Sequence, residues 1–316
     1  MSDDERRAPL VAGVDIGGTS IKWMLVDEDG GIEASGREAT RPAQIIDQAR
    51  GIVRSLVERH PGIRGIGATC PGIVDEPRGV VLFASNLDLR DAPLRAALAE
   101  ASGRPTALIH DGRAAGIAEG LFGSGRGADS FAMIPIGTGI SAALMLGGEL
   151  WAGSAFCAGE IGHSPIFPDG ETCACGQRGC LEAYASANGL KRRYFERTGR
   201  MIGAREIELN LETDADARAV WETATTALGI AIAQMTLSLD PARFIIGGGL
   251  AGAGETLLGP MRAAAAARLE WRPLPEVVAA ELGPSAGRWG GAVAAARAAG
   301  SECYEAWSVA SARGSG

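Results

Sequence analysis

One histidine and three cysteines, with glycines between them, lie close together near the middle of the chain: His163, Cys173, Cys175 and Cys180. Three thiolates and one imidazole form a closed tetrahedral ligand set for zinc, which leaves no open position for water. Glycines let a short loop turn tightly around such an ion. Unrelated thiols beside a histidine are the simpler alternative, but three of the 6 cysteines fall in this one segment. The spacing therefore predicts a structural zinc site.

Two glutamates, Glu160 and Glu182, bracket this segment. A loop wrapped around a metal holds the neighbouring backbone in place, so both carboxylates would keep fixed positions. We expect these glutamates to carry function, while the zinc orients the loop that presents them.

A glycine turn between two apolar runs near the N-terminus is a second candidate for chemistry. Gly17, Gly18 and Thr19 would expose backbone N–H groups and one hydroxyl, which can surround a phosphate group. Asp15 could hold Mg²⁺ through water, since this ion prefers carboxylate and phosphate oxygens and keeps most of its waters. Lys22 adds positive charge. Taken alone, this turn is better explained as a plain hairpin.

The same arrangement occurs again at Gly137, Thr138 and Gly139, between two further apolar runs. Two such turns can hold a polyphosphate from both sides, so the repetition favours phosphate binding over two unrelated hairpins. Pro135 stands where the first copy has Asp15, so only the first turn offers a carboxylate to a metal ion.

Two other segments that follow predicted strands are less specific. Gly247, Gly248 and Gly249 would let a flat ring system approach the backbone, but a flexible strand-to-helix turn explains them equally well. Asp111 lies at a strand end, where α/β folds place ligands, and it could accept the proton of an attacking hydroxyl in phosphoryl transfer. A helix cap is the alternative, and by sequence alone it is favoured, because aspartate is common at caps.

The elements that must position these residues alternate between strands and helices. Apolar runs bounded by turn residues predict strands over 10–14, 21–26, 32 onward, 63–68, 107–109, 133–136, 140–146 and 243–246. Apolar residues at helical spacing predict helices over 42–60, 94–101, 113–121, 214–239, 254–269 and 289–299. The segment 203–213 is expected to be a loop and strand edge. The alternation indicates an α/β fold, and the repeated strand–turn–strand unit predicts two related domains with ligands bound in the cleft between them.

Composition excludes several classes of protein. The 316 residues are 46% hydrophobic, enough for a sizeable core, and the net charge of −8 argues against a nucleic-acid surface. No apolar run is long enough to span a membrane, and the charged N-terminus lacks the apolar centre of a signal peptide. We therefore expect a cytoplasmic protein with reduced cysteines, in which Cys70, Cys157 and Cys303 are small buried side chains.

Together these segments resemble the ROK family, which contains bacterial sugar kinases and sugar-responsive repressors. The likeness extends from residue 13 to about residue 299. It rests on six segments, of which the last two are highly specific: 15–19 with Lys22, 71–75, 86–87, 137–139, 159–163 and 173–182.

The resemblance implies a two-domain fold similar to actin and hexokinase (ribonuclease H-like), with an interdomain cleft. The smaller α/β domain would comprise 1–112 plus 289–316, and the larger, which carries the zinc loop, would comprise 113–288. The resemblance also implies a homodimer that phosphorylates a hexose at its 6-hydroxyl with ATP and Mg²⁺, and that closes its domains to exclude water.

The resemblance further assigns residues to roles. Asp111 would be the catalytic base. The sugar would contact Asn86, Glu160, His163 and Glu182 through its hydroxyls, with the backbone near Gly72 close by. The nucleotide and its metal would be bound by Asp15, Gly17, Gly18, Thr19, Lys22, Gly137, Thr138 and Gly139, with Gly247 and Gly248 near the ring system. Zinc would be bound by His163, Cys173, Cys175 and Cys180.

One departure from the family pattern bears on the substrate. Kinases of this family usually have Asn-Asp followed by Ala-Asn at this strand end, whereas this chain has His110 before Asp111 and Arg113 at the later position. An amide donates and accepts freely, while a neutral histidine offers one donor and one acceptor on a rigid ring. We expect His110 to alter recognition of a secondary hydroxyl, at the 3- or 4-position. A modified hexose such as kanosamine, a C7 cyclitol or an N-acylated hexosamine is then an alternative to glucose.

Two other functional classes are less consistent with the sequence. A sugar-sensing repressor would need a helix-turn-helix before the first strand, and only nine residues precede Leu10. A non-catalytic, zinc-stabilised binding protein would have no need of both Asp15 and Asp111. We therefore expect an ATP-dependent sugar kinase that binds a sugar and ATP but neither nucleic acid nor membrane.

Overall fold

The computed structural model describes residues 10–308, which form two units: unit 1 contains 10–126 and 284–308, and unit 2 contains 127–283. Each unit is built on one five-stranded sheet with helices packed against it. Among the described residues, no helix is both long and apolar enough to cross a bilayer.

In unit 1 the sheet has the order β3-β2-β1-β4-β8. The first three strands are antiparallel neighbours, whereas β1, β4 and β8 run parallel. Their bounds are β1 (Leu10–Ile16), β2 (Ser20–Asp27), β3 (Ile32–Ala39), β4 (Ile63–Cys70) and β8 (Thr106–His110). A small antiparallel sheet follows β4, made of β5 (Ile73–Asp75), β6 (Val80–Ala84) and β7 (Leu89–Ala92), with the 3₁₀ turn η3 (Ser85–Leu87) between the last two.

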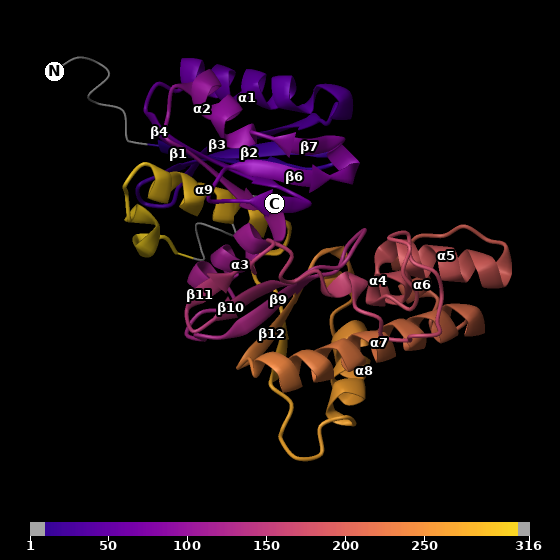
Figure 1. The fold of residues 1–316 in the computed structure, drawn as a ribbon. Coiled ribbons are helices and arrows are strands. Elements are labelled where there is room, and N and C mark those ends of the chain that lie inside the picture. The colour runs from indigo at the N-terminus through magenta and orange to yellow at the C-terminus, as the bar shows by residue number, and fades with distance from the viewer. Residues whose placement is uncertain (1–9, 309–316) are drawn as a thin grey trace. The chain divides into compact units, whose positions relative to one another are not determined.

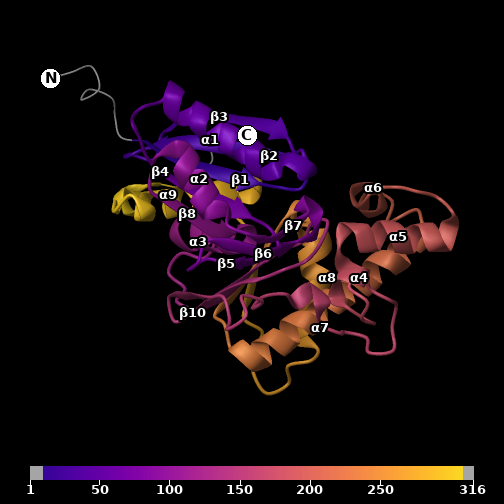
Figure 2. The same cartoon turned by 45° about the horizontal axis from the view of Figure 1, so that its top comes forward.

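Helices cover both faces of this sheet, as Figures 1 and 2 show. One face packs on α1 (Ile45–Arg59), which the turn η2 (Pro42–Gln44) precedes, and on α2 (Leu94–Ser102). The other face packs on α9 (Ala286–Ala298), which in turn packs on α3 (Asp111–Phe122). Alternation along β1 decides which side chains meet which helix: Val14 enters the core with α1, and Gly13 lies against α9.

Glycines allow α9 to lie directly on β1 and β4. A Cβ atom at Gly13 would stand 2.4 Å from the carbonyl oxygen of Arg288, and one at Gly67 would stand 1.8 Å from that of Gly291. Neither backbone oxygen can move without shifting the helix. These positions therefore admit no side chain while α9 keeps its place.

In unit 2 the sheet has the order β11-β10-β9-β12-β13. Its first three strands are again antiparallel neighbours, and β9, β12 and β13 run parallel. The bounds are β9 (Phe131–Pro135), β10 (Ala143–Leu146), β11 (Glu149–Trp151), β12 (Arg243–Gly247) and β13 (Glu276–Ala279). The two units therefore repeat one strand order and one pattern of strand directions, as the repeated strand–turn–strand unit in the sequence predicts.

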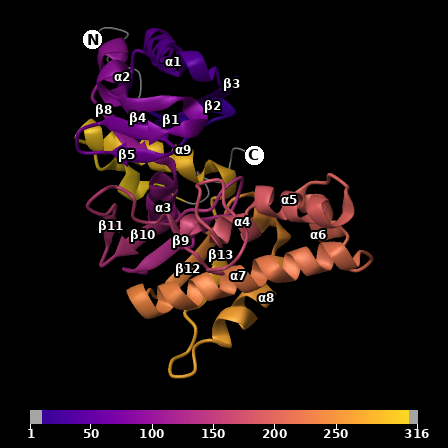
Figure 3. The same cartoon turned by 45° about the vertical axis from the view of Figure 1, so that its right-hand side comes forward.

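One face of this sheet forms the core of unit 2 with two helices, α7 (Ala215–Leu239) and α8 (Glu255–Ala266), which Figure 3 shows side by side. The helix α7 begins where Asp214 caps it, since this carboxylate accepts hydrogen bonds from the backbone N–H groups of Asp216 and Ala217. The remaining elements of unit 2 are α4 (Leu181–Ala185), α5 (Ala187–Thr198), α6 (Ala204–Leu209), and the turns η4 (Ile161–His163) and η5 (Gly249–Ala253). Two turns flank α9: η6 (Gly283–Ser285), which begins at the last residue of unit 2, and η7 (Cys303–Ala306).

Three expectations about the fold differ from the structure. The side chain of Cys157, expected to be buried, is exposed. The segment 203–213 contains α6, so the predicted loop and strand edge is wrong: Ile207 is fully buried, and this packing stabilises a helix too short to be stable alone. The helix α3, which the expected division assigns to the larger domain, packs on α9 and lies in unit 1.

The contact between β4 and α9 yields a test of the fold. We expect Gly67→Ala to lower the free energy of unfolding by about 1–3 kcal/mol, because the added methyl group must push α9 off the sheet. Gly51→Ala is the matched control: Gly51 is exposed within α1, with nothing within 4 Å of its added Cβ, and should gain up to about 1 kcal/mol. Urea unfolding measures both variants. A Gly67→Ala variant as stable as the unaltered protein would show that this contact is not tight.

Candidate active site

The carboxyl ends of the parallel strands in unit 1 bring two aspartates into one site. Asp15 is near the end of β1 and Asp111 directly follows β8, with β4 pairing between these strands. Burial raises the pKa of Asp15 above its usual range, and the nearby charge of Asp111 raises it further. The sequence placed both residues at strand ends, and the structure brings them within electrostatic reach of each other.

Asp15 is held by its neighbours on the two adjoining strands. Its Oδ1 accepts a 2.8 Å hydrogen bond from the hydroxyl of Thr69, its partner on β4. Its Oδ2 lies 3.8 Å from Nζ of Lys22, its partner on β2. The positive charges of Lys22 and of Arg288 on α9 partly offset the effects that raise its pKa.

The environment of the two aspartates suits a hard divalent cation. Burial is the main cause that raises the pKa of both carboxyl groups, so each would gain from a positive charge in the site. Mg²⁺ is bound in proteins through one or two carboxylates while it keeps several waters. Asp15 and Asp111 fit that ligand preference.

Asp111 is the first residue of α3 and is not its cap. The N-cap is His110, whose Nδ1 accepts a hydrogen bond of 3.3 Å from the backbone N–H of Arg113. The carboxylate of Asp111 accepts a 2.6 Å hydrogen bond at Oδ1 from the N–H of Gly112. The cap role that the sequence favoured for Asp111 thus belongs to its neighbour, and the Asp111 side chain remains 41% exposed.

The first glycine turn closes the hairpin between β1 and β2. The N–H of Gly17 donates to the carbonyl of Ser20, while Gly18 and Thr19 are exposed. Asn86 on η3 lies beside this turn: a Cβ atom at Gly18 would be 3.0 Å from its amide nitrogen. A candidate sugar ligand and a candidate phosphate-binding turn are therefore neighbours.

Gly72 belongs to the same unit, in the turn between β4 and β5. It has a φ of +95°, and a Cβ atom there would stand 2.2 Å from the carbonyl of Phe83. Only glycine fits this close approach of two backbone segments.

The second glycine turn lies between β9 and β10 in unit 2. The N–H of Gly137 donates to the carbonyl of Gly139, and a bridge pairs Ile136 with Ile140. Glu182 stabilises the turn, because its Oε2 accepts a 2.9 Å hydrogen bond from the N–H of Ile140. One candidate sugar ligand thus contacts a candidate phosphate-binding turn in this unit too.

A cavity of about 570 Å³ adjoins this turn. The third glycine segment forms part of its wall, and Gly248 packs its backbone against that of Ile136 with a φ of +76°. Helices α6 and α7 supply further walls. The lining residues are Gly137, Thr138, Ala187, Ala204, Arg205, Glu208, Trp221, Gly249, Leu250, Gly252 and Ala253. Glycine backbone and the indole of Trp221 in its wall suit a ligand with an anionic group and a flat ring.

The histidine and cysteines of unit 2 converge as their spacing predicts. The four candidate ligand atoms all lie within 4.8 Å of one another. The Sγ atoms of Cys175 and Cys180 are 3.8 Å apart, and Sγ of Cys173 is 3.9 Å from Nδ1 of His163. Tetrahedral zinc with Zn–S bonds of about 2.3 Å requires ligand separations of about 3.8 Å. The donor set and its spacing therefore fit zinc.

The same loop carries the two bracketing glutamates. Glu160 directly precedes η4, and the backbone N–H of His163 donates to its carbonyl. Glu182 lies two residues beyond Cys180, in the first turn of α4. Backbone pairing of Pro165 with Cys180 ties the two ends together, so the segment positions both carboxylates.

Several residues of the site carry no signal in the sequence. Thr69, Glu76 and Arg288 reach the aspartates or their neighbours from segments distant in the chain. Arg205 and Trp221 line the cavity of unit 2 from helices whose polar and apolar patterns are unremarkable in sequence. Only the folded arrangement shows these contacts.

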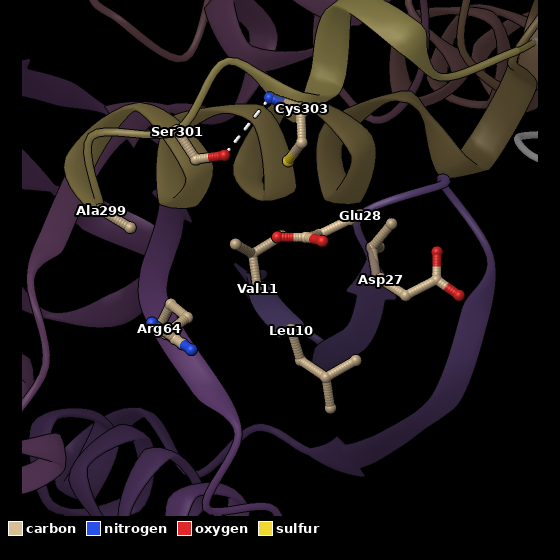
Figure 4. A pocket seen from close by; sticks show the side chains of 9 residues that line it. Leu10, Val11, Asp27, Glu28, Arg64, Ala299, Ser301 and Cys303 are labelled. Atoms are coloured by element: carbon tan, nitrogen blue, oxygen red, sulfur yellow. Dashed lines mark hydrogen bonds between the residues drawn. The ribbon is translucent and has the colours of Figure 1, made fainter. Parts of the chain in front are cut away.

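A smaller cavity of unit 1, about 150 Å³, opens at the other end of the sheet from the aspartates (Figure 4). Its walls include Leu10 and Arg64 at the starts of β1 and β4, and Glu28 just beyond β2. Ser301 accepts a hydrogen bond from the N–H of Cys303 at its rim. None of the predicted site residues lines it.

Comparison with known proteins shows which family the sequence matches. The profile of the ROK family matches residues 11–298. A glucokinase of Streptomyces coelicolor is 33% identical over 306 residues, which cover 90% of this chain and 96% of that protein. A xylose repressor of Bacillus subtilis is 25% identical over 84% of this chain and 70% of the repressor.

A solved structure shows a similar fold. It is that of a ROK family glucokinase from Streptomyces griseus in complex with glucose and AMPPNP, with a TM-score of 0.79 and 34% sequence identity over 91% of this chain and 99% of that one. This likeness, together with the repeated strand order of the two units, confirms the predicted α/β fold of the actin and hexokinase type.

Proposed function

The chain belongs to the ROK family, and we propose that it is an ATP-dependent sugar kinase that phosphorylates a hexose at its 6-hydroxyl. The proposal rests on the closeness of Asp15 and Asp111 at one edge of the sheet. Phosphoryl transfer to a hydroxyl needs both a base and a carboxylate that binds the metal ion. The glucokinase relatives support the same reaction, and the solved relative holds glucose and an ATP analogue.

In this reaction Asp111 accepts the proton of the attacking hydroxyl. Its raised pKa makes it a better base than an aspartate with an ordinary pKa, while the N–H of Gly112 keeps the carboxylate oriented. Asp15 would hold Mg²⁺, which neutralises phosphate charge when bound. Lys22 and the backbone of the exposed residues Gly18 and Thr19 would add to that neutralisation.

Unit 2 offers further candidate contacts for the nucleotide. Gly137, Thr138 and Gly139 would contact phosphate oxygens. The adjoining cavity, with Gly247 and Gly248 beside it, would take the nucleoside. Its volume of about 570 Å³ is in the range of pockets that enclose small organic ligands.

We propose sugar contacts in each unit: in unit 1 the backbone at Gly72 with the side chains of Asn86 and Asp111, and in unit 2 the side chains of Glu160, His163 and Glu182. These groups offer mostly carboxylates, amides and imidazoles, which are the partners that sugar hydroxyls require. The zinc proposed at His163, Cys173, Cys175 and Cys180 would not touch the reacting atoms; it would hold the loop that presents Glu160 and Glu182.

Glucose or a modified glucose such as kanosamine is the proposed acceptor, with a C7 cyclitol or an N-acylated hexosamine as alternatives. Two groups at the end of β8 support a modified hexose, because neither is a free amide. His110 is buried and caps α3, and Arg113 is 2% exposed and bonded to Glu76. A secondary hydroxyl that an asparagine would bind therefore finds different partners here.

A kinase is better supported than a sugar-sensing repressor, although repressors occur among the relatives. The glucokinases match at higher identity, and a repressor would not need a base at Asp111. A non-catalytic binding protein would need neither aspartate. Homodimerisation and the absence of nucleic-acid binding stay predictions, which light scattering and a DNA-binding assay can check.

Replacing the proposed base tests the function directly. We expect Asp111→Asn to lower kcat by about 10²–10⁴-fold, because the amide cannot accept the proton, while ATP still binds. A coupled assay of ADP release with glucose measures the rate. Asp47→Asn, on the exposed side of α1, is the control and should retain full turnover. Undiminished turnover of Asp111→Asn would refute the proposal.

Zinc binding is tested at the fully buried ligand Cys180. We expect one zinc per chain in the purified protein, and Cys180→Ser should weaken zinc binding by more than about 100-fold and lower Tm, because a ligand is lost and not merely an outer contact. Cys157→Ser, at an exposed thiol outside the cluster, should change neither. Stoichiometric zinc in Cys180→Ser, measured by mass spectrometry of the metal, would contradict the site.

Acceptor choice is tested with a panel of hexoses, aminosugars and C7 cyclitols, with product mass as the readout. We expect kcat/KM for 3-amino-3-deoxyglucose to exceed that for glucose by about tenfold or more, and His110→Asn to move this ratio toward glucose. The ratio cancels any effect of the substitution common to all acceptors. A strong preference for glucose that His110→Asn leaves unchanged would refute the modified-hexose proposal.

A further inference from the structure

We propose that His110 is a positioning residue for Asp111: its Nε2–H donates to one carboxylate oxygen and leaves the other to accept the proton of the sugar hydroxyl. Arg113 and Glu76 would hold the imidazole in the orientation this requires. The inference rests on the proposed function, since it assigns to His110 a role in the reaction that Asp111 performs.

The geometry places the two side chains against each other. His110 is the last residue of β8 and is 6% exposed, with Nε2 3.3 Å from Oδ1 of Asp111. The N–H of Gly112 donates to the same oxygen. The N–H of Gly112 thus already occupies Oδ1, and Nε2 lies beside the same oxygen without a hydrogen bond in this arrangement. The last torsion of an aspartate is soft, so a small rotation would bring the carboxylate onto Nε2–H, and contacts of this kind tighten once substrate binds. Both donors would then meet one oxygen, and Oδ2 would be left for the acceptor.

The cap of α3 decides which imidazole nitrogen carries the proton. Nδ1 accepts the backbone N–H of Arg113, so it must be unprotonated, and the single proton of a neutral ring is then on Nε2. Burial, and next the charge of Arg113, lower the pKa of His110 to about 4. The ring therefore stays neutral near pH 7 and presents Nε2–H toward Asp111.

A buried ion pair fixes the backbone that carries this ring. Oε1 of Glu76 accepts the N–H of His110 at 3.0 Å and Nε of Arg113 at 2.6 Å. The same guanidinium donates to the carbonyl of Val74 at 3.1 Å. These bonds tie the start of α3 to the segment that follows β4, so neither the ring nor the first turn of the helix is free to rotate away.

A purely structural role for His110 makes different demands. Asparagine also caps helices, so His110→Asn keeps the bond to Arg113 but is too short to replace Nε2. Glutamine places an amide donor near the position of Nε2 but caps poorly. If His110 is only a helix cap, Tm should fall in the variant that caps poorly, and kcat should stay unaltered in both variants. If His110 positions Asp111, kcat should fall in the variant that lacks a donor near the position of Nε2.

The experiment compares His110→Asn, His110→Gln and the control His60→Asn, a histidine at the end of α1, in the full-length protein. Measured quantities are Tm, kcat, the KM values for ATP and sugar, and the pH profile of kcat.

We expect His110→Asn to fold normally and to lower kcat about tenfold or more with little change in KM. The acid limb of its profile should move to higher pH, because the carboxylate loses a donor that favours its charged form. His110→Gln should recover part of kcat, and His60→Asn should match the unaltered protein.

Each other outcome has a definite meaning. An unaltered kcat and pH profile in His110→Asn overturns the positioning role, as does an equal loss in His110→Gln. A raised KM for the sugar with unaltered kcat overturns it as well and assigns His110 to sugar binding alone. Full turnover of Asp111→Asn would instead remove the proposed function, so the two failures are distinguishable.

Discussion

The parallel pairing of β1, β4 and β8 is the constraint on which the candidate site depends. Because parallel strands end at one edge of a sheet, residues far apart in the chain are brought to a common line: Asp15, Thr69 and Ile109, with His110 one position further along β8. The ladder can be covered closely by α9 only because glycines on β1 and β4 carry no side chain. A backbone requirement thus decides where the aspartates are and how near Arg288 comes to them.

The second sheet repeats this construction but serves other chemistry. In unit 1 the strand ends present carboxylates, whereas in unit 2 the equivalent turn presents glycine backbone, with Pro135 in place of an acidic residue. Unit 2 adds a cavity walled by helices and a cysteine–histidine loop. One repeated frame therefore carries two aspartates at the strand ends in one copy, and a cavity beside a glycine turn in the other.

The two aspartates of the site lie in surroundings that disfavour their charged forms. Burial raises the pKa of both Asp15 and Asp111, which is a cost to the folded state at neutral pH. Neighbours offset part of this cost: a threonine hydroxyl and Lys22 for Asp15, and the N–H of Gly112 for Asp111. Carboxyl groups with shifted pKa values that lie together at the ends of strands are typical of functional sites.

The sequence by itself determined the features that depend on local spacing. The candidate zinc ligands between His163 and Cys180, both glycine turns, the helix over 214–239 and the α/β class follow from neighbours along the chain, where period and residue type suffice. Contacts between distant segments were decided only by the tertiary structure: the Thr69 bond to Asp15, the hold of Glu76 on His110, and Ile207 turning 204–209 into a helix. The physical reason is that a hydrogen bond or a buried face has partners set by strand register and packing, and neither leaves a pattern in the residues that precede or follow it.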